Sequence, residues 1–85
     1  MRRIPIADSF DLHSFAPQDV ISVLEEYLRE AREAGFREVR LIHGKGAGVR
    51  RAQVRRWLAD RADVADYFDG GPGRGGAGAT VVVLR

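Results

Sequence analysis

The stretch EVRLIHGKGAGV, residues 38–49, decides how this chain folds. Its first five residues include three aliphatic side chains, which predicts an inner β-strand over residues 38–42. Three glycines follow within five residues, and a helical pattern begins near Val49. A strand that leads through a glycine-rich loop into a helix is typical of an α/β fold, and the rest of the sequence extends this pattern on both sides.

Before this stretch, the sequence predicts one strand and one helix. Residues 9–12 alternate polar and apolar side chains, as a short half-buried strand does. Residues 17–34 carry apolar side chains at helical spacing. Pro17 suits the first turn of that helix, and Gly35 suits its C-terminal end.

After the glycine loop, helical spacing predicts a second helix over residues 49–62. A short strand over 64–68 and a β-branched strand over 79–84 follow, separated by a loop over 70–78. The order β-α-β-α-β-β predicts an α/β domain of the α+β sandwich type, with a four-stranded mixed sheet and two helices packed on it. The first two strands should be parallel. The last two could pair antiparallel or be joined by a longer crossing connection.

The length of 85 residues limits the chain to one domain with a modest core and excludes two-lobed enzymes. We expect residues 1–8 to form an N-terminal extension and residues 9–85 to form the domain. The absence of cysteine excludes disulfides, zinc–thiolate sites and cysteine nucleophiles. No apolar run approaches the ~20 residues of a membrane span, and no signal-peptide core follows the basic start. The expected location is the cytoplasm.

The two histidines follow two neighbouring strands of the predicted sheet. His13 comes at the end of the first strand and His43 at the end of the second. Parallel strands end at the same edge of a sheet, where open α/β sheets bind their ligands. Histidine changes charge near neutral pH and can serve as a general base or acid. The sequence therefore predicts that both histidines lie at one candidate site.

The loop HGKGAG, residues 43–48, has the features of a phosphate cradle. Glycines let a ligand approach the backbone closely, and the start of a helix presents free N–H groups and the positive end of its dipole. Lys45 adds a positive charge. The spacing matches neither the Walker motif nor the dinucleotide-binding G-x-G-x-x-G motif, so the loop alone does not define a nucleotide site.

The formal net charge of +2 hides a strong separation of charge along the chain. Residues 40–61 carry a net charge of +6, and the other 63 residues sum to −4. A basic segment of this kind is typical of a nucleic-acid or phosphate interface. Arg51 and Arg55 share one face of the second helix, whereas Arg50 lies nearer its core side and is expected to extend its charged group to solvent.

These features also have structural interpretations. An arginine-rich helix can be an ordinary solvated face, a histidine at a strand end can be structural, and Asp11 can cap the loop that follows it. The 70–78 loop is expected to be a flexible connection first and a nucleic-acid contact through Arg74 second. Tyr27 and Trp57 are expected in the core. No exposed aromatic side chain stands out as a platform for stacking bases.

The motifs FDLH (residues 10–13), HGKGAG (43–48) and GATVVVL (78–84), with Arg51 after the second motif, resemble the Smr (small MutS-related) domain family. The resemblance covers residues 9–85 and identifies the chain as a stand-alone member. It implies a fold like the C-terminal domain of translation initiation factor 3. Family members nick DNA or cleave RNA, including messenger RNA on stalled ribosomes. The sequence departs from the family at Ser14-Phe15, where glycine commonly follows D-L-H, and at Arg50, where leucine is common.

The resemblance and the residues together predict a nucleic-acid-binding domain with endonuclease activity on DNA or RNA. Asp11 and His13 match the catalytic D-x-H of the family, and His43, Gly44 and Gly46 match its H-G-x-G. The expected catalytic residues are Asp11, His13 and His43. The expected phosphate-binding residues are Gly44, Lys45, Gly46, Gly48, Arg51, Arg55 and Arg74. No metal ligand is assigned, but Asp11 could either orient a histidine or hold Mg²⁺ or Mn²⁺.

Two alternatives remain. One is a module that binds DNA, RNA or a ribosomal surface without cleavage, and the other is a protein-interaction domain whose basic face meets an acidic partner.

Overall fold

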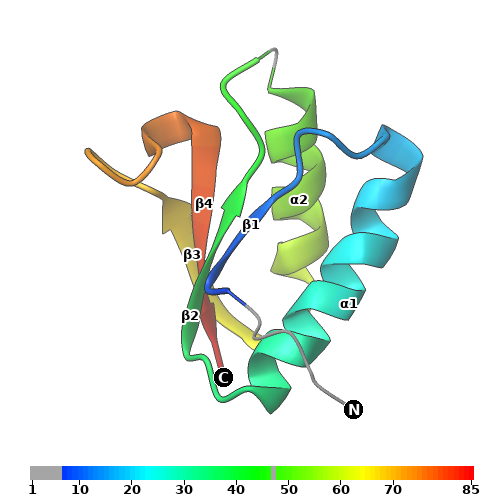
Figure 1. Ribbon diagram of the computed structural model, residues 1–85, viewed down its shortest axis with the longest axis vertical. Coiled ribbons are helices and arrows are strands. Elements are labelled where there is room, and N and C mark those ends of the chain that lie inside the picture. The colour runs from blue at the N-terminus through cyan, green and yellow to red at the C-terminus, as the bar shows by residue number, and fades with distance from the viewer. Residues whose placement is uncertain (1–6, 47) are drawn as a thin grey trace.

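The computed structural model describes residues 7–46 and 48–85, which form a four-stranded sheet with both α-helices on one side (Figure 1). The predicted N-terminal extension of residues 1–8 lies mostly outside the described residues, of which only Ala7 and Asp8 belong to it. The strands are β1 (Ser9–Asp11), β2 (Glu38–Ile42), β3 (Val64–Asp69) and β4 (Ala79–Leu84). The helices are α1 (Val20–Glu33) and α2 (Val49–Ala59), with short 3₁₀ turns at Pro17–Asp19 and Gly76–Gly78.

The strand order across the sheet is β1-β2-β4-β3. β1 and β2 are parallel, as the strand–helix–strand connection predicts. β4 lies between β2 and β3 and is antiparallel to both, so the last two strands pair antiparallel. The β-α-β-α-β-β order and the mixed four-stranded sheet are confirmed. The carboxyl ends of β1 and β2 therefore share one edge, next to the start of β4.

The core fills the space between the helices and one face of the sheet. Val39 and Leu41 of β2 point to this face, and their cross-strand partners on β4 are Val82 and Thr80. Tyr27 of α1 is buried and its ring stacks on Phe10 with 4.6 Å between centroids, as expected of a core residue. The helices contribute the buried residues Val20, Leu24, Leu28, Ala31, Val54 and Leu58. Trp57 is only half-buried and packs at the edge of this core.

The second helix ends earlier than its sequence pattern predicts. α2 stops at Ala59 rather than near Ala62. Beyond Ala59 the backbone turns, and the Arg61 N–H donates a 3.2 Å hydrogen bond to the Leu58 carbonyl. In this turn the Arg61 guanidinium lies 4.4 Å from the Trp57 ring centroid and donates two 2.9 Å hydrogen bonds to Asp63, just before β3 begins. The first helix is likewise shorter, because residues 17–19 form a 3₁₀ turn before α1 begins.

The glycine-rich segment of residues 70–78 differs from the flexible connection that its composition predicts. Its backbone is closed by hydrogen bonds, among them Gly70 N–H to the carbonyls of Gly76 and Ala79, both 3.1 Å. Gly71 and Gly73 have left-handed φ angles of +78°, which glycine adopts readily. The segment is a defined turn that leads β3 back into β4. Within the described residues, no helix is long and apolar enough to cross a membrane.

We predict that Gly70→Ala destabilises the protein, because an added Cβ would overlap the Arg74 carbonyl oxygen and displace the turn. A cost of about 1–3 kcal/mol in the free energy of unfolding is expected for such overpacking. Urea denaturation measures it. Gly46→Ala is the matched control, since a Cβ there meets nothing within 4 Å. Equal stability of the two variants would show that the turn is not ordered in this way.

Candidate functional site

The first candidate residues form a pair at the end of β1. The Asp11 carboxylate accepts a 3.0 Å hydrogen bond from the His13 backbone N–H and also contacts the Nδ1 atom of the His13 ring. Because a carboxylate only accepts, Nδ1 carries the proton of this contact and Nε2 is the open position of the ring. These hydrogen bonds, the backbone one first, hold the pKa of Asp11 below its ordinary value. Asp11 is therefore a carboxylate at neutral pH that orients an exposed imidazole.

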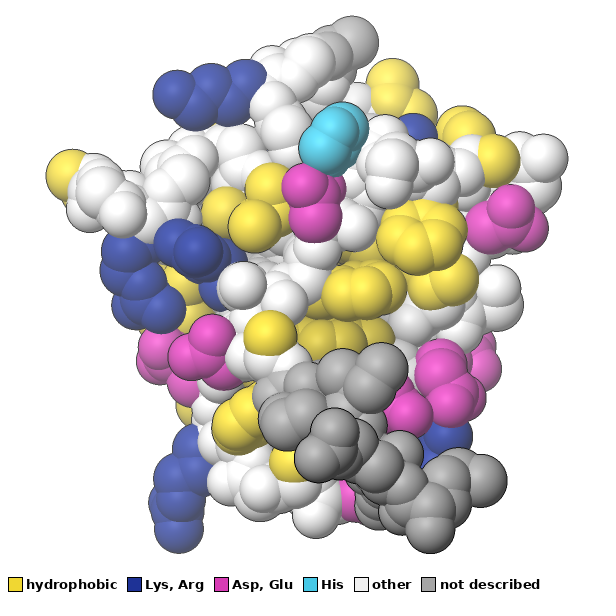
Figure 2. All heavy atoms as spheres, in the orientation of Figure 1, with side chains coloured by type: hydrophobic (Ala, Val, Ile, Leu, Met, Phe, Trp, Pro, Cys, Tyr) yellow, Lys and Arg dark blue, Asp and Glu magenta, His cyan; other side chains and the backbone are white. Residues whose placement is uncertain are grey.

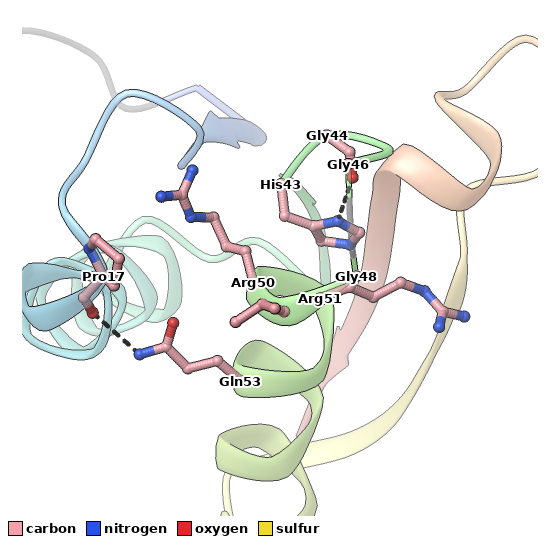
Figure 3. Close-up of a pocket in the computed structure, with 9 residues that line it drawn as sticks. Pro17, His43, Gly44, Gly46, Gly48, Arg50, Arg51 and Gln53 are labelled. Carbon is pink, nitrogen blue, oxygen red and sulfur yellow. Dashed lines mark hydrogen bonds between the residues drawn. The ribbon is translucent and has the colours of Figure 1, made fainter.

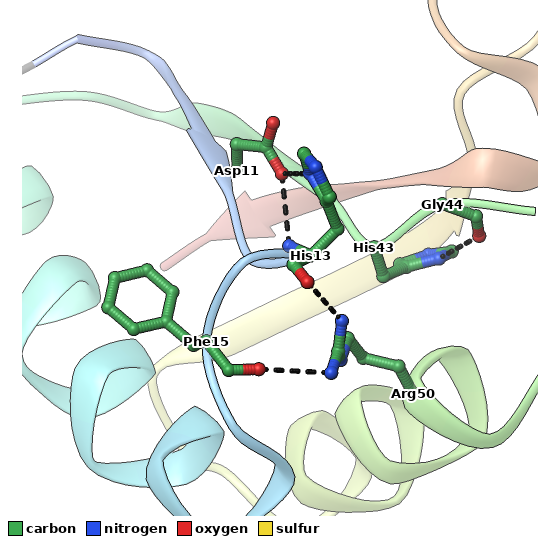
Figure 4. Close-up of polar contacts among 6 residues, drawn as sticks. All are labelled: Asp11, His13, Phe15, His43, Gly44 and Arg50. Carbon is green, nitrogen blue, oxygen red and sulfur yellow. Dashed lines mark hydrogen bonds and ion pairs between the residues drawn. The ribbon is translucent and has the colours of Figure 1, made fainter.

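Arg50 connects this pair to the second helix. Its guanidinium donates a 2.7 Å hydrogen bond to the carbonyl of His13 and a 3.0 Å hydrogen bond to the carbonyl of Phe15 (Figure 4). The side chain of Gln53 adds a 3.0 Å hydrogen bond to the carbonyl of Pro17. The sequence pattern predicts only that Arg50 extends to solvent. The structure shows that it holds the loop after β1 against α2.

A pocket of about 240 Å³ lies between Pro17 of the first 3₁₀ turn, the glycine loop and the start of α2 (Figure 3). Gly44 and Gly48 both have φ angles of +84°, so the glycines at these positions are needed for the turn of the backbone. Gly48 is also the N-cap of α2, where no side chain caps the helix. The pocket lining is Pro17, His43, Gly44, Gly46, Gly48, Val49, Arg50, Arg51 and Gln53. Ala47 of the predicted loop lies outside the described residues.

His43 has a different environment from His13 although both follow parallel strands. Its side chain is buried, and its ring points toward Gly44 and away from the Asp11–His13 pair (Figure 4). Nδ1 lies 3.1 Å from the Gly44 carbonyl, and Nε2 lies 2.8 Å from the Thr80 hydroxyl. A carbonyl only accepts, so Nδ1 is the protonated nitrogen and Nε2 accepts the hydroxyl hydrogen. Both ring nitrogens thus have partners inside the protein.

Burial lowers the pKa of His43, and Arg51 and Arg55 nearby lower it further. The unfolded chain therefore takes up a proton on this residue at a higher pH than the folded chain. The stability that His43 contributes is complete above its ordinary pKa of 6.5 and falls as the pH decreases below that value.

The basic residues of α2 are largely engaged within the protein. The Arg51 and Arg55 guanidinium groups both contact one oxygen of Asp69, at 2.9 and 2.5 Å. These contacts, first the hydrogen bond from Arg51, lower the pKa of Asp69. Arg55 also lies 5.6 Å from the Tyr67 ring centroid. Arg51 still lines the pocket, whereas Arg55 serves mainly to join α2 to β3.

The remaining predicted phosphate ligands lie apart from each other. Lys45 is exposed on the glycine loop. Arg74 instead forms a 3.2 Å ion pair with Glu38 and borders a different hollow on the sheet. The structure thus brings Asp11, His13 and the loop glycines to one end of the sheet, and it separates Arg74 from them.

Sequence reasoning missed three functional contributions here. They are the loop contacts of Arg50 and Gln53 and the pairing of Asp69 with two arginines. Of these three residues, only Arg50 is unusual in the sequence, because leucine is common at its position in the family that the chain resembles. Asp69 could not be found in this way, since it is 18 residues from Arg51.

Few potential metal ligands gather among the described side chains of the site. No group of three or more His, Asp or Glu side chains able to hold a metal ion occurs among residues 7–46 and 48–85. Asp11 supplies one carboxylate, and Mg²⁺ prefers several oxygen ligands. An ion at the end of β1 would therefore take its other ligands from substrate phosphate and water.

Comparison with known proteins shows that the chain is similar to Smr domains. The family model described as the Smr domain matches residues 10–85. The Smr domain of Thermus thermophilus MutS2 superposes with a TM-score of 0.86 at 38% identity, over 91% of this chain and 96% of that one. YdaL, a stand-alone small MutS-related protein from Escherichia coli, also gives 0.86 at 32% identity, over 92% of this chain and 64% of its own.

Curated relatives are similar over a smaller share of their length. The protein named endonuclease MutS2 of Clostridium kluyveri is 36% identical over 80 residues, which are 94% of this chain and 10% of that protein. The endonuclease MutS2 of Caldicellulosiruptor bescii is 39% identical over 77 residues, again 10% of its length. The chain thus spans about a tenth of the curated relatives it matches.

We predict that the His43 ring is neutral at pH 7, with its proton on Nδ1, and that it titrates below pH 6.5. Nitrogen chemical shifts of the ring measure both properties. Thr80→Val should leave Nε2 without a donor and cost about 1–3 kcal/mol of unfolding free energy. Thr80→Ser keeps the hydroxyl and is the control. A ring protonated on Nε2 at pH 7 would contradict this assignment.

We also predict that Arg50→Met loosens the loop after β1, because the carbonyls of His13 and Phe15 lose their donor. Amide hydrogen exchange at Phe15, whose N–H bonds to the Leu12 carbonyl, should become faster. The unfolding free energy should fall by about 1 kcal/mol. Arg56→Met, at an exposed position of the same helix, should change neither quantity. Unchanged exchange at Phe15 would show that Arg50 does not hold the loop.

Proposed function

Because the chain belongs to the Smr domain family, we propose that it binds nucleic acid and hydrolyses phosphodiester bonds at the end of β1. The observation that carries this proposal is the Asp11–His13 pair. The ionised Asp11 carboxylate fixes the tautomer of the exposed His13 imidazole. The Nε2 atom of that ring is then free to contact a substrate that approaches from solvent. The relatives named endonuclease MutS2 support the same chemistry, although this chain matches only a tenth of their length.

A phosphate group would be held in the neighbouring pocket. The backbone N–H groups at the start of α2 are not capped by a side chain, and they carry the positive end of the helix dipole. The guanidinium of Arg50 uses two of its five N–H groups for the loop carbonyls, so others remain for an anion. Lys45 adds a charge on the exposed side of the loop. These groups would also stabilise the extra negative charge of the transition state.

The proposed reaction needs one proton acceptor close to the phosphate. His13 Nε2 takes a proton from the attacking oxygen, which is a water molecule or the 2′-hydroxyl of RNA. That oxygen forms a new bond to phosphorus, and the bond from phosphorus to the leaving oxygen breaks. The leaving oxygen takes a proton from solvent. Asp11 stabilises the imidazolium that His13 becomes.

His43 contributes to this proposal chiefly by shaping the glycine loop. The predicted role of His43 as a second proton-transfer group would require its ring to leave both Thr80 and Gly44. In its present position it fixes the carbonyl of Gly44 and joins the loop to β4. We therefore assign catalysis to Asp11 and His13, and the position of the loop to His43.

We predict that His13→Ala lowers the cleavage rate of single-stranded, duplex or branched DNA or RNA by about 10²–10⁴-fold, as loss of a general base does. Asp11→Asn should also lower it, because the amide no longer stabilises a charged imidazole. Asp60→Asn, an exposed acid at the far end of α2, is the matched control. The assay is product formation from labelled strands, with and without Mg²⁺, Mn²⁺ or EDTA. Cleavage that is unchanged in His13→Ala would refute the catalytic assignment.

A second candidate function is binding without cleavage, to DNA, RNA or a ribosomal surface. The observation that favours it is the burial of His43, which leaves His13 as the one exposed imidazole of the chain. The same pocket would then hold a phosphate but transfer no proton. Salt-dependent binding with no products under any metal condition would establish this function instead. Binding to an acidic protein in the absence of nucleic-acid binding would favour the protein-interaction alternative.

A further inference from the structure

The face of the sheet opposite the helices carries a row of side chains with a specific composition. Cross-strand pairing places Ser9 beside Arg40, Arg40 beside Val81, and Val81 beside Phe68. Residues paired across neighbouring strands point to the same face of the sheet. Each residue of this row is next in sequence to a residue on the core face, and successive side chains point to opposite faces. This row therefore crosses all four strands on the side that the helices leave uncovered. We call it the open-face row.

The open-face row presents an aromatic ring to solvent. Phe68 is 44% exposed, one of the two large hydrophobic side chains exposed among the described residues. Its neighbour Val81 is completely buried although no helix covers this face. In this row, Phe68 and Arg40 lie on the two sides of Val81.

The same surface carries two arginines, and Arg40 lies two strands from Phe68. Arg40 has no ion pair among the described residues, and Arg74 extends from the 70–78 turn to Glu38, across the hollow that Arg40 also lines. On the left of Figure 2, basic side chains lie above acidic ones, and a further basic side chain lies below them. On the uncovered face, Glu38 and Asp66 are both paired with Val83, one row further from the candidate site. Glu38 pairs with Arg74 and Asp8 also lines the hollow, so Arg40 supplies the charge of this surface that has no ion pair among the described residues.

The surface is continuous with the Asp11–His13 pair. Asp11 lies two residues after Ser9 on β1 and therefore points to the same face, one row closer to the strand ends. From Phe68 to Asp11 the surface crosses three strand spacings, about 15 Å. A chain of a few nucleotides that passes over the open-face row would thus reach the candidate site.

We propose that the open-face row binds a single-stranded segment of nucleic acid, with one base stacked on Phe68 and its phosphates next to Arg40 and Arg74. Single-stranded nucleic acid would then be the substrate of the proposed function. The inference rests on that function only for hydrolysis at the Asp11–His13 pair. A single strand offers the free base faces that stack on aromatic side chains, whereas a duplex keeps its bases stacked on each other. An acidic protein would pair with the arginines, but its carboxylates would gain nothing specific from the exposed Phe68 ring.

The test measures binding of short fluorescein-labelled single strands and of a matched duplex by fluorescence anisotropy, with DNA and RNA arms. His13→Ala protein is used so that the strands stay intact. Phe68→Ala should weaken single-strand binding about ten-fold, and Phe68→Tyr should retain it. Arg40→Gln and Arg74→Gln should each reduce the slope of log K against log salt by about 0.7. Arg37→Gln, at the opposite end of β2, is the charge-matched control and should leave the slope unchanged.

A second measurement locates the base directly. Single strands that carry 4-thiouridine or 5-iododeoxyuridine should cross-link to β3 at Phe68, as mass spectrometry of the peptides would show. Urea denaturation checks that each variant is folded. If Phe68→Ala and Arg40→Gln bind single strands like the parent and no cross-link forms on β3, the inference is wrong.

The outcomes separate this inference from the proposed function. Cleavage that depends on His13 but not on Phe68 or Arg40 would support the hydrolytic site and overturn the binding surface. Single-strand binding through Phe68 without any cleavage would support the surface and overturn the hydrolysis. Equal binding of duplex and single strands would also overturn the surface, because a duplex has no free base face to stack.

Discussion

One carbonyl oxygen organises the end of the sheet where the candidate site lies. The Gly78 carbonyl accepts hydrogen bonds from the backbone N–H groups of both His43 and Gly44, at 3.0 and 2.9 Å. These bonds extend the β2–β4 pairing past the last residue of β2 and hold the first part of the glycine loop. Thr80, two residues further on β4, then meets the His43 ring. Gly78 packs closely here, since an added Cβ would lie 3.1 Å from the Lys45 side chain.

This arrangement explains why two histidines with equivalent places in the sequence differ in chemistry. β4 lies against β2 and covers the residue after it, so His43 is buried and its pKa is lowered. β1 is an edge strand with no neighbour on its outer side, and His13 after it remains exposed although Arg50 contacts its backbone carbonyl. The strand order therefore decides which imidazole is accessible to a substrate. Each histidine follows the end of a strand, so this place in the sequence does not distinguish the two rings.

Local patterns predicted most of the fold and part of the site. The alternation in residues 9–12, the helical spacing after Pro17 and the glycines after His43 are short-range signals, and they placed the elements and the loop correctly. The partners of Arg51 and Arg55 depend on β3 lying beside α2, and the exposure of Phe68 depends on which face the helices leave open. Neither is visible before the strand order is known. For the same reason the +6 of residues 40–61 overstated the free charge, because three of its arginines pair with Asp63 and Asp69.

The position of Arg50 has a thermodynamic consequence. A single guanidinium both lines the pocket and bonds to the carbonyls of the loop that carries His13. An anion in the pocket would interact with a group whose other contacts set the position of that loop. Occupancy and loop position would then be linked equilibria, and a ligand that prefers one loop position would bind more tightly when the loop already holds it. One side chain would in this way couple binding in the pocket to the position of His13.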